Sequence, residues 1–250
     1  MKNIIAKVRI EENRQLNHKT WLLRLSGYNP ENPIAGQFVE ISIPGKFLRR
    51  PISVHRYYKD SKDLYLMYDV VGEGTRILSI MRPGENLNLL ESLGNGFSIP
   101  DNISNPVLLG GGIGVAPLYQ LALDLVYAGK KPVVILGFNT KEDLIEEMLE
   151  LRLDGIPVYV ATVDGSYGTK GFVTDVITDK NIYYDYFYAC GPLPMLKSVS
   201  TLPKDGELSL ESRMGCGFGI CMCCSIETKD GTKRICKEGP VFRKEELIWK

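Results

Sequence analysis

Apolar and polar residues alternate with a period of two along much of the first hundred positions of the chain. Such alternation places the apolar side chains on one face of a β-strand. The apolar positions are Ile4, Ala6, Val8 and Ile10, then Trp21, Leu23 and Leu25, then Val39, Ile41 and Ile43, and finally Leu64, Leu66, Tyr68 and Val70. Turn sequences such as Tyr28–Asn29–Pro30 and Arg82–Pro83–Gly84 separate the runs. Several short strands with regular breaks predict a small antiparallel β-barrel.

The pattern changes after Pro106, where short apolar runs alternate with segments of helical period. Leu118, Leu121, Ala122 and Leu125 fall at i, i+3, i+4 and i+7, which predicts a helix that begins at Pro117. The other elements predicted here are strands at 107–109, 133–136, 158–161 and 183–189, and a helix around Leu144, Ile145, Met148 and Leu149. Strands that alternate with helices predict a parallel, doubly wound α/β sheet. A short cysteine-rich tail follows from about Leu208.

Composition narrows the classes of function. The 250 residues include 30 basic and 30 acidic side chains, so the formal net charge is zero. Neither nucleic acid nor an anionic membrane surface is therefore an expected partner. Residues 1–10 lack the apolar core of a signal peptide, and glycines, Pro117, Gln120 and Asp124 interrupt the apolar stretch at 106–128. We expect a cytoplasmic protein that does not enter the membrane.

Five of the six cysteines lie between positions 216 and 236. Disulfides are rare in the cytosol, so clustered cysteines there more often hold a metal. The spacing of Cys216, Cys221 and Cys224, with Cys236 more distant, is C-x4-C-x2-C…C, which is the plant-type [2Fe–2S] pattern. These four thiols are the predicted ligands of a [2Fe–2S] cluster.

Two alternatives stay open from the spacing alone. The first is a structural zinc site with four cysteine ligands, although zinc sites favour C-x2-C pairs and only Cys221 and Cys224 form one. The second concerns Cys223, a fifth thiol inside the loop, which spacing does not exclude as a substitute ligand. We interpret Cys223 as a spare residue.

A second motif, Arg50–Pro51–Ile52–Ser53, follows a basic stretch and precedes Gly72–Glu73–Gly74–Thr75. An arginine can bind a flavin pyrophosphate through two hydrogen bonds. Gly74 and Thr75 are expected to open a helix whose N–H groups receive phosphate oxygens, and a serine hydroxyl can reach the flavin N5 edge. Taken singly, Arg50 could be a solvated surface charge and the two glycines an ordinary turn.

A third motif is the glycine run Gly110, Gly111, Gly112 and Gly114, placed between a strand and a helix. Such a junction suits a pyrophosphate, although proline stands where G-x-G-x-x-G has its last glycine. Cys190–Gly191–Pro192 follows the last predicted strand, at the end where α/β proteins bind ligands; a buried core cysteine is the alternative. Residues 137–143 contain one lysine and two acids, so NAD is favoured over NADP.

The flavin motif, together with Gly36–Gln37–Phe38, resembles the flavin-binding barrel of the ferredoxin–NAD(P) reductase superfamily. The whole chain resembles more narrowly the electron-transfer subunits of B-type dihydroorotate dehydrogenases. The segments that carry this resemblance are Arg49–Ser53, Leu93–Phe97, Gly110–Leu118, Asp164–Ser166 with Gly168 and Gly171, Cys190–Met195 and Glu211–Met214. Cys223 departs from the family, in which a small residue is usual.

The resemblance implies a fold of three parts: an antiparallel FAD-binding β-barrel at 1–100, a Rossmann-like parallel α/β domain for NAD at 101–207, and a small [2Fe–2S] subdomain at 208–250. It places Cys190 beside the nicotinamide ring and makes Ser53 and Cys190 the candidate catalytic residues. It also implies a partner, an FMN-containing catalytic subunit that oxidises dihydroorotate, in a heterotetramer of two plus two subunits. Electrons would pass from that FMN through the cluster and FAD to NAD⁺.

Two rival interpretations remain. Related subunits serve flavin-based ferredoxin–NAD(P) reductases and sulfide dehydrogenases; in some of them an aspartate is the first cluster ligand, whereas this chain has Cys216. The other rival is a non-enzymatic module in which a reductase fold holds a structural zinc ion.

Overall fold

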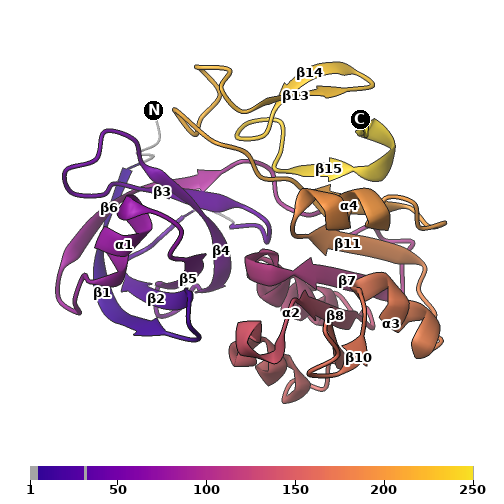
Figure 1. Ribbon diagram of the computed structural model, residues 1–250. Helices are drawn as coiled ribbons and strands as arrows, with labels where there is room; N and C mark the ends of the chain where they lie inside the picture. Colours follow the sequence, from indigo (N-terminus) through magenta and orange to yellow (C-terminus); the bar gives the residue numbers. More distant parts are fainter. Residues whose placement is uncertain (1–4, 31–32, 250) are drawn as a thin grey trace.

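A computed structural model describes residues 5–30 and 33–249 of the chain, so Ile4 of the first predicted strand lies outside the described residues. The amino-terminal part is a closed antiparallel barrel with strand order β1-β2-β5-β4-β3-β6 (Figure 1). Its elements are β1 (Ile5–Gln15), β2 (Thr20–Ser26), β3 (Phe38–Ile41), β4 (Arg50–Tyr58), β5 (Asp63–Asp69), α1 (Glu73–Ser79) and β6 (Asn86–Leu93). The predicted barrel is confirmed. Its core holds the alternating apolar positions, among them Val8, Leu23 and Ile41.

The second part is a seven-stranded sheet with order β10-β9-β8-β7-β11-β12-β15. Its elements are β7 (Pro106–Gly111), the 3-10 turn η1 (Gly112–Val115), α2 (Leu118–Tyr127), β8 (Val133–Phe138), η2 (Lys141–Asp143), η3 (Glu146–Arg152), β9 (Val158–Thr162), β10 (Thr169–Lys170), α3 (Val173–Asp179), β11 (Tyr186–Cys190), α4 (Leu193–Val199) and β12 (Gly206–Ser209). All neighbouring strands from β10 to β12 run parallel, so the doubly wound sheet is confirmed.

The helix predicted around Leu144 and Met148 is instead two short 3-10 turns, η2 and η3, joined by extended backbone at Leu144 and Ile145. Asn17, on the barrel, explains the break. Its side-chain amide donates to the carbonyl oxygens of Asp143 (3.1 Å) and Leu144 (3.4 Å). Those carbonyls therefore bond the barrel rather than N–H groups four residues further along. Leu144, Ile145 and Met148 of this segment are buried, and Leu149 is partly buried.

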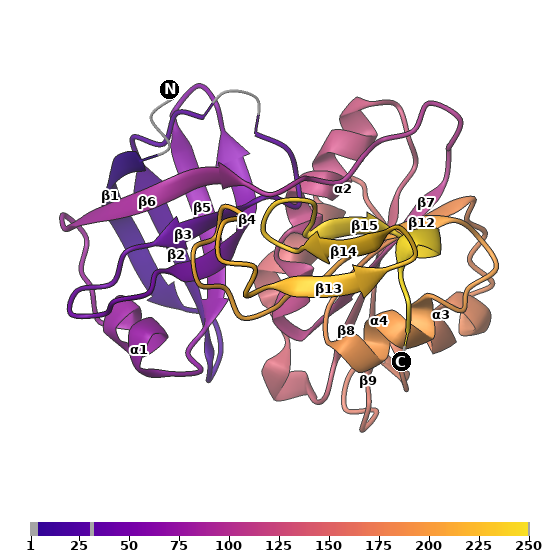
Figure 2. The same cartoon turned by 90° about the horizontal axis from the view of Figure 1, so that it is seen from above.

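The carboxyl-terminal segment contains β13 (Ser225–Thr228), β14 (Gly231–Arg234), β15 (Val241–Arg243) and η4 (Lys244–Glu246). β15 pairs antiparallel with β12 and so forms an edge of the sheet. At the other side, Asn95 follows β6 of the barrel, and its backbone N–H donates to Gly239 O at 2.6 Å. Figure 2 shows this segment lying across the junction of the barrel and the sheet.

The barrel and the sheet also meet directly through His55 of β4. Its ring is 1% exposed and lies 2.9 Å, at Nδ1, from the carbonyl oxygen of Ala116. Burial lowers the pKa of His55 from 6.5 to about 4. The ring is therefore neutral at pH 7, and because a carbonyl only accepts, Nδ1 carries the hydrogen.

This burial makes stability depend on pH. Below pH 6.5 the unfolded chain binds a proton at His55, whereas the folded chain does not bind this proton until the pH falls to about 4. Acid therefore favours unfolding across that window, by roughly 3 kcal/mol at its lower end. We expect urea unfolding to show that the free energy of unfolding of the wild type falls by this amount between pH 7 and 4, relative to that of His55→Asn. The asparagine side chain does not titrate. Parallel stability profiles between pH 7 and 4 would contradict the prediction.

Candidate functional site

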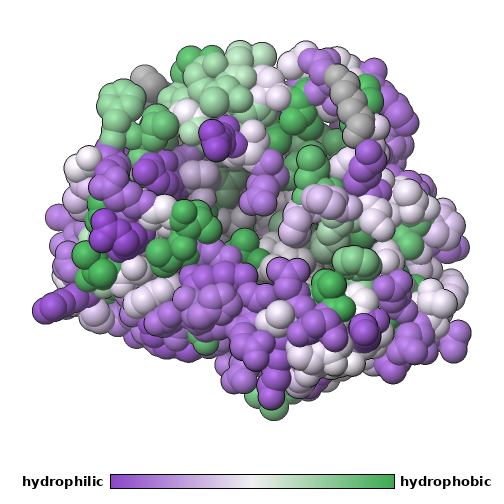
Figure 3. All heavy atoms as spheres, viewed as in Figure 1, coloured by the Kyte–Doolittle hydropathy of each residue, from purple (hydrophilic) through white to green (hydrophobic). Residues whose placement is uncertain are grey.

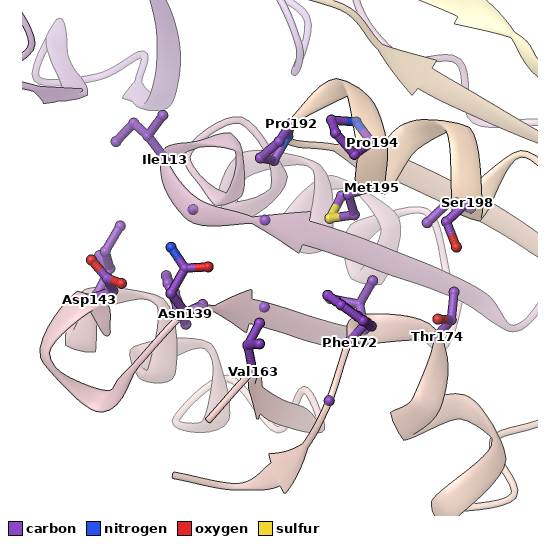
Figure 4. A pocket seen from close by; sticks show the side chains of 18 of the residues that line it. Ile113, Asn139, Asp143, Val163, Phe172, Thr174, Pro192, Pro194, Met195 and Ser198 are labelled. Atoms are coloured by element: carbon purple, nitrogen blue, oxygen red, sulfur yellow. The ribbon is translucent and has the colours of Figure 1, made fainter. Parts of the chain in front are cut away.

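A cavity of about 410 Å³ opens at the carboxyl ends of β7 and β8 (Figure 4). This is within the size range of small-molecule sites, and it is the end of the sheet where α/β proteins bind ligands. Its walls come from the turn after β7 (Gly111–Ile113), the end of β8 (Gly137–Asn139), the start of α3 (Phe172–Thr174) and the start of α4 (Pro192, Pro194, Met195 and Ser198). The remaining lining comes from Lys19 and Thr20 of the barrel and from five further residues of the α/β domain: Asp143, Ile145, Val163, Gly171 and Val199.

The four glycines predicted for a nucleotide have two different tasks. Gly111 and Gly112 line the cavity. Gly110 and Gly114 instead permit close packing: a Cβ on Gly110 would lie 2.8 Å from Val115 Cγ1, and one on Gly114 would lie 2.6 Å from Gly191 Cα. Because Gly114 has no Cβ, the turn after β7 can pack against the turn after β11. Pro192 lines the cavity, whereas Cys190 and Gly191 stand behind this packed contact.

Some lining residues gave no signal in the sequence analysis. Phe172 and Thr174 enter the cavity because α3 starts there, and the only local sign of that start is Asp175, whose carboxylate accepts the N–H of Phe172 at 2.7 Å. On the rim, Lys19 of the barrel pairs with Asp143 at 2.6 Å. Since these two residues are 124 positions apart, only the fold brings them together.

Cys190 ends β11 as a protonated thiol. Burial raises its pKa to about 12, although a hydrogen bond with Ser209 opposes the shift. Glu211 acts in the same direction as burial, and its own pKa is raised by burial and by the nearby charge of Asp69. Asp69, on β5 of the barrel, accepts the hydroxyl hydrogen of Thr20 at 2.6 Å. A neutral thiol close to the Glu211 carboxyl group can donate a hydrogen bond but is not a nucleophile.

Arg50 and Gly74 meet where β4 passes the start of α1. A Cβ on Gly74 would lie 2.3 Å from Arg50 Nε, so only glycine leaves room for the guanidinium. Arg50 donates to the carbonyl oxygens of Leu48 (2.6 Å) and Arg49 (3.2 Å), and no carboxylate of the described residues forms an ion pair with it. Its charge is thus available to an anion.

Thr75 and Ser53 flank Arg50 differently. The Thr75 hydroxyl already accepts the N–H groups of Val71 (3.0 Å) and Gly72 (3.3 Å), so it shapes the turn before α1. Ser53 lies three residues beyond Arg50 on β4, or about 10 Å along the strand. The predicted flavin residues therefore lie on one strand and the adjoining helix start.

The four predicted cluster ligands form two pairs of thiols. Cys216 and Cys221 share a side-chain hydrogen bond, and so do Cys224 and Cys236. The second pair is buried, and the Cys236 N–H donates to Cys224 Sγ at 3.4 Å. Cys223 is exposed and contacts the carbonyl oxygen of Arg213 instead, at 3.7 Å.

Backbone amides surround the Cys216 sulfur. The N–H of Ile220 lies 3.3 Å from it and that of Cys221 3.5 Å. Burial alone would raise the pKa of this thiol, but N–H groups of Cys221, Phe218 and Ile220 outweigh burial and lower it to about 6. The loop therefore stabilises a thiolate, which is the form that binds metals.

The arrangement in pairs bears on the choice between iron and zinc. A structural zinc needs four ligands around one centre, whereas each iron of a [2Fe–2S] centre takes two of the four thiolates. The donor set fits the binuclear cluster.

Glu40 of β3 is a residue that the sequence analysis did not select. It is 1% exposed, and its carboxylate oxygens have no hydrogen-bond partner among the described residues. The side chain faces the cysteine loop: a Cβ on Gly217 would lie 2.6 Å from Glu40 Oε1. Burial raises the pKa of Glu40 to about 7, Arg49 opposes this, and Cys216 adds to it.

The cavity can be tested with one substitution. A Cβ on Gly111 would lie 2.5 Å from Met195 Sδ, so Gly111→Val should fill the space between the two turns. We expect binding of NADH, measured by fluorescence titration, to weaken at least tenfold. Ala128→Val is the control, because it adds a β-branched side chain at an exposed position of the same domain. Unchanged NADH binding by Gly111→Val would show that the cavity is not the nucleotide site.

Comparison with known proteins finds two family models that match parts of the chain. A profile described as the iron-sulfur cluster binding domain of dihydroorotate dehydrogenase B matches residues 211–248, and an oxidoreductase NAD-binding domain matches residues 108–201. The dihydroorotate dehydrogenase B (NAD(+)) electron transfer subunit of Geobacillus sp. (strain WCH70) is 45% identical over 237 residues, covering 90% of this chain and 91% of the relative. That of Fusobacterium nucleatum is 40% identical, covering 93% and 94%.

Among solved structures, an NADH-dependent reduced ferredoxin-NADP oxidoreductase, studied for flavin-based electron bifurcation, superposes with a TM-score of 0.86. It is 29% identical in sequence, and the superposition covers 97% of this chain and 90% of that one. Among the described residues, no helix has both the length and the apolar character needed to cross a lipid bilayer.

Proposed function

Because the chain belongs to the family of dihydroorotate dehydrogenase B (NAD(+)) electron transfer subunits, we propose that it carries electrons from a dihydroorotate-oxidising subunit to NAD⁺ in pyrimidine biosynthesis. Its cofactors are a [2Fe–2S] cluster, FAD and NAD. The observation that carries the proposal is the cysteine loop, with its two thiol pairs and its amide-stabilised Cys216, placed across the junction of the barrel and the sheet.

We assign the three parts of the chain as follows: residues 1–100 hold FAD, residues 101–207 hold NAD, and residues 208–250 hold the cluster on Cys216, Cys221, Cys224 and Cys236. FAD, when bound, supplies the link between the one-electron cluster and the two-electron nicotinamide. On the barrel, Arg50 neutralises the charge of the FAD pyrophosphate. Pro51, Ile52 and Ser53 form the part of the strand that contacts the flavin. Gly74 and Thr75 shape the turn that faces the phosphates.

On the sheet, Gly111, Gly112 and Pro192 line the cavity that holds the nicotinamide nucleotide. Gly110, Gly114 and Gly191 let the two turns pack. Cys190 lies behind the packed turns rather than in the cavity lining, and its pKa, raised to about 12, keeps it a neutral thiol there. It therefore places no negative charge close to the site where hydride arrives.

We further propose that the partner is an FMN-containing catalytic subunit, in an assembly of two plus two subunits, and that the cysteine loop is part of the contact. Three large apolar side chains of the loop are exposed: Phe218 by 44%, Ile220 by 74% and Met222 by 50%. Figure 3 shows hydrophobic surface gathered over this segment. Apolar groups concentrated on one surface segment are typical of a protein interface. Contact at this loop would bring the second flavin close to the cluster.

A substitution in the loop tests the proposal in the complex reconstituted with the catalytic subunit. We expect Cys216→Ser to abolish dihydroorotate-driven NADH formation and to lose its iron, which should be near two atoms per chain in the wild type. The variant should still bind FAD and should still reduce ferricyanide with NADH. Cys223→Ser is the matched control, since Cys223 lies in the same loop outside both thiol pairs. If Cys223→Ser loses iron equally, the four-ligand assignment is wrong; if wild type forms no NADH from dihydroorotate, the function is wrong.

The flavin site has its own test. Arg50→Gln removes the unpaired guanidinium, and loss of a charge-assisted hydrogen bond costs about 1.5–3 kcal/mol. We therefore expect the FAD dissociation constant to rise ten- to a hundredfold, measured by flavin fluorescence on ultrafiltration, with NADH affinity little changed. Arg82→Gln, at an exposed arginine beyond the end of α1, is the control. Equal weakening of FAD and NADH by Arg50→Gln would remove Arg50 from the pyrophosphate site.

A further inference from the structure

Strand β4 contains an irregularity just beyond its flavin motif. Along the ladder with β5, Val54 pairs with Leu66 while Arg56 pairs with Tyr65. His55 is therefore an extra residue, and β4 bulges there. A β-bulge redirects a side chain out of the regular alternation, and such bulges are common next to active sites.

The bulge directs His55 at the turn that follows β7. The His55 Nδ1–H donates to the carbonyl oxygen of Ala116 at 2.9 Å, and its ring lies 4.8 Å from the ring of Tyr119. Ala116 ends η1, the turn whose Gly112 lines the cavity and whose Gly114 packs against Gly191. One hydrogen bond thus connects the strand of Ser53 to the turn that faces the nucleotide.

Further contacts join β4 to α2 beyond Ala116, among them a 3.4 Å hydrogen bond from Arg56 Nη1 to the Tyr119 hydroxyl. The N–H of Tyr57 donates to Gln120 Oε1 at 3.1 Å, and the Arg56 guanidinium lies 5.2 Å from the centre of the Tyr119 ring. These contacts involve partly exposed groups. His55 makes the buried, directional contact nearest to the turn, so it fixes the position of the turn more tightly than they do.

We propose that His55 is a positioning residue for hydride transfer. The bulge at His55 and its hydrogen bond to Ala116 hold the turn after β7, the nicotinamide turn, at the distance from β4 that the transfer requires. The inference rests on the proposed function, in which β4 holds FAD and the turn faces nicotinamide. In the reductive half-reaction NADH gives one hydride to FAD, so that NADH becomes NAD⁺ and FAD takes up the two electrons. His55 touches neither reacting atom and acts through Ala116.

The test is anaerobic stopped-flow reduction of the FAD-loaded protein by NADH, followed at the flavin absorbance. His55→Leu removes the donor and keeps a buried side chain of similar width. We expect the limiting rate at saturating NADH to fall at least about tenfold, as misplacement of reactants does. The NADH dissociation constant and the FAD content should change less than twofold, and the long-wavelength flavin–nicotinamide charge-transfer band should weaken.

Two further variants separate positioning from general packing. His55→Asn places an amide N–H close to the position of Nδ1–H and should recover most of the rate and of the charge-transfer band. Gln120→Ala removes the outer contact only and should react at the wild-type rate. If His55→Leu does not fold, His55→Gln, whose donor lies one carbon further out, serves in its place and should also be slow.

Each failure has a distinct signature. Wild-type rates in both His55→Leu and His55→Gln would overturn the positioning role, as would an equal loss in Gln120→Ala or no rescue by His55→Asn. If wild type binds no FAD, or if NADH does not bleach its flavin, the proposed function itself fails, and the positioning role fails with it.

Discussion

Strand β4 is part of the barrel and also packs against the α/β domain, so its position affects the geometry of both parts. Within the barrel it is hydrogen-bonded to β3 on one side and β5 on the other, so its backbone is fixed. Its first half carries Arg50 and Ser53, and its second half, from His55, lies against α2 and the turn before it. In the proposed function, a shift of this strand would change its distance from both the flavin and the nicotinamide turn. One backbone segment would then set how the two nucleotides lie relative to each other.

The local patterns of the sequence predict most of the fold because the forces behind them are local. Alternation predicted the barrel strands, the 3.6-residue period predicted α2, and cysteine spacing predicted the loop. The helix expected at Leu144 shows the limit of this reasoning. Asn17, more than a hundred positions away, takes the carbonyls that the helix would need. No window of local sequence contains that competition.

The candidate site divides in the same way. Gly111, Gly112 and Pro192 could be selected from the sequence because a strand and a helix flank them in the chain. Glu40 could not, since a polar residue between Val39 and Ile41 is typical of the solvent face of a strand. It is buried only because the carboxyl-terminal segment covers that face. His55 could not be selected either, because nothing local distinguishes a bulge there from ordinary strand.

The carboxyl-terminal segment is fastened to both the sheet and the barrel. β15 completes the sheet beside β12, and the Asn95 backbone and side chain hold Gly239 and Glu238 to the barrel. Many electron carriers deliver their charge by swinging on a hinge, with a rate set by diffusion of the moving domain. Here the segment that contains the cysteine loop is hydrogen-bonded to both the barrel and the sheet. In the proposed function, a separation between the loop and the barrel that is established at folding takes the place of a hinged movement of a carrier domain.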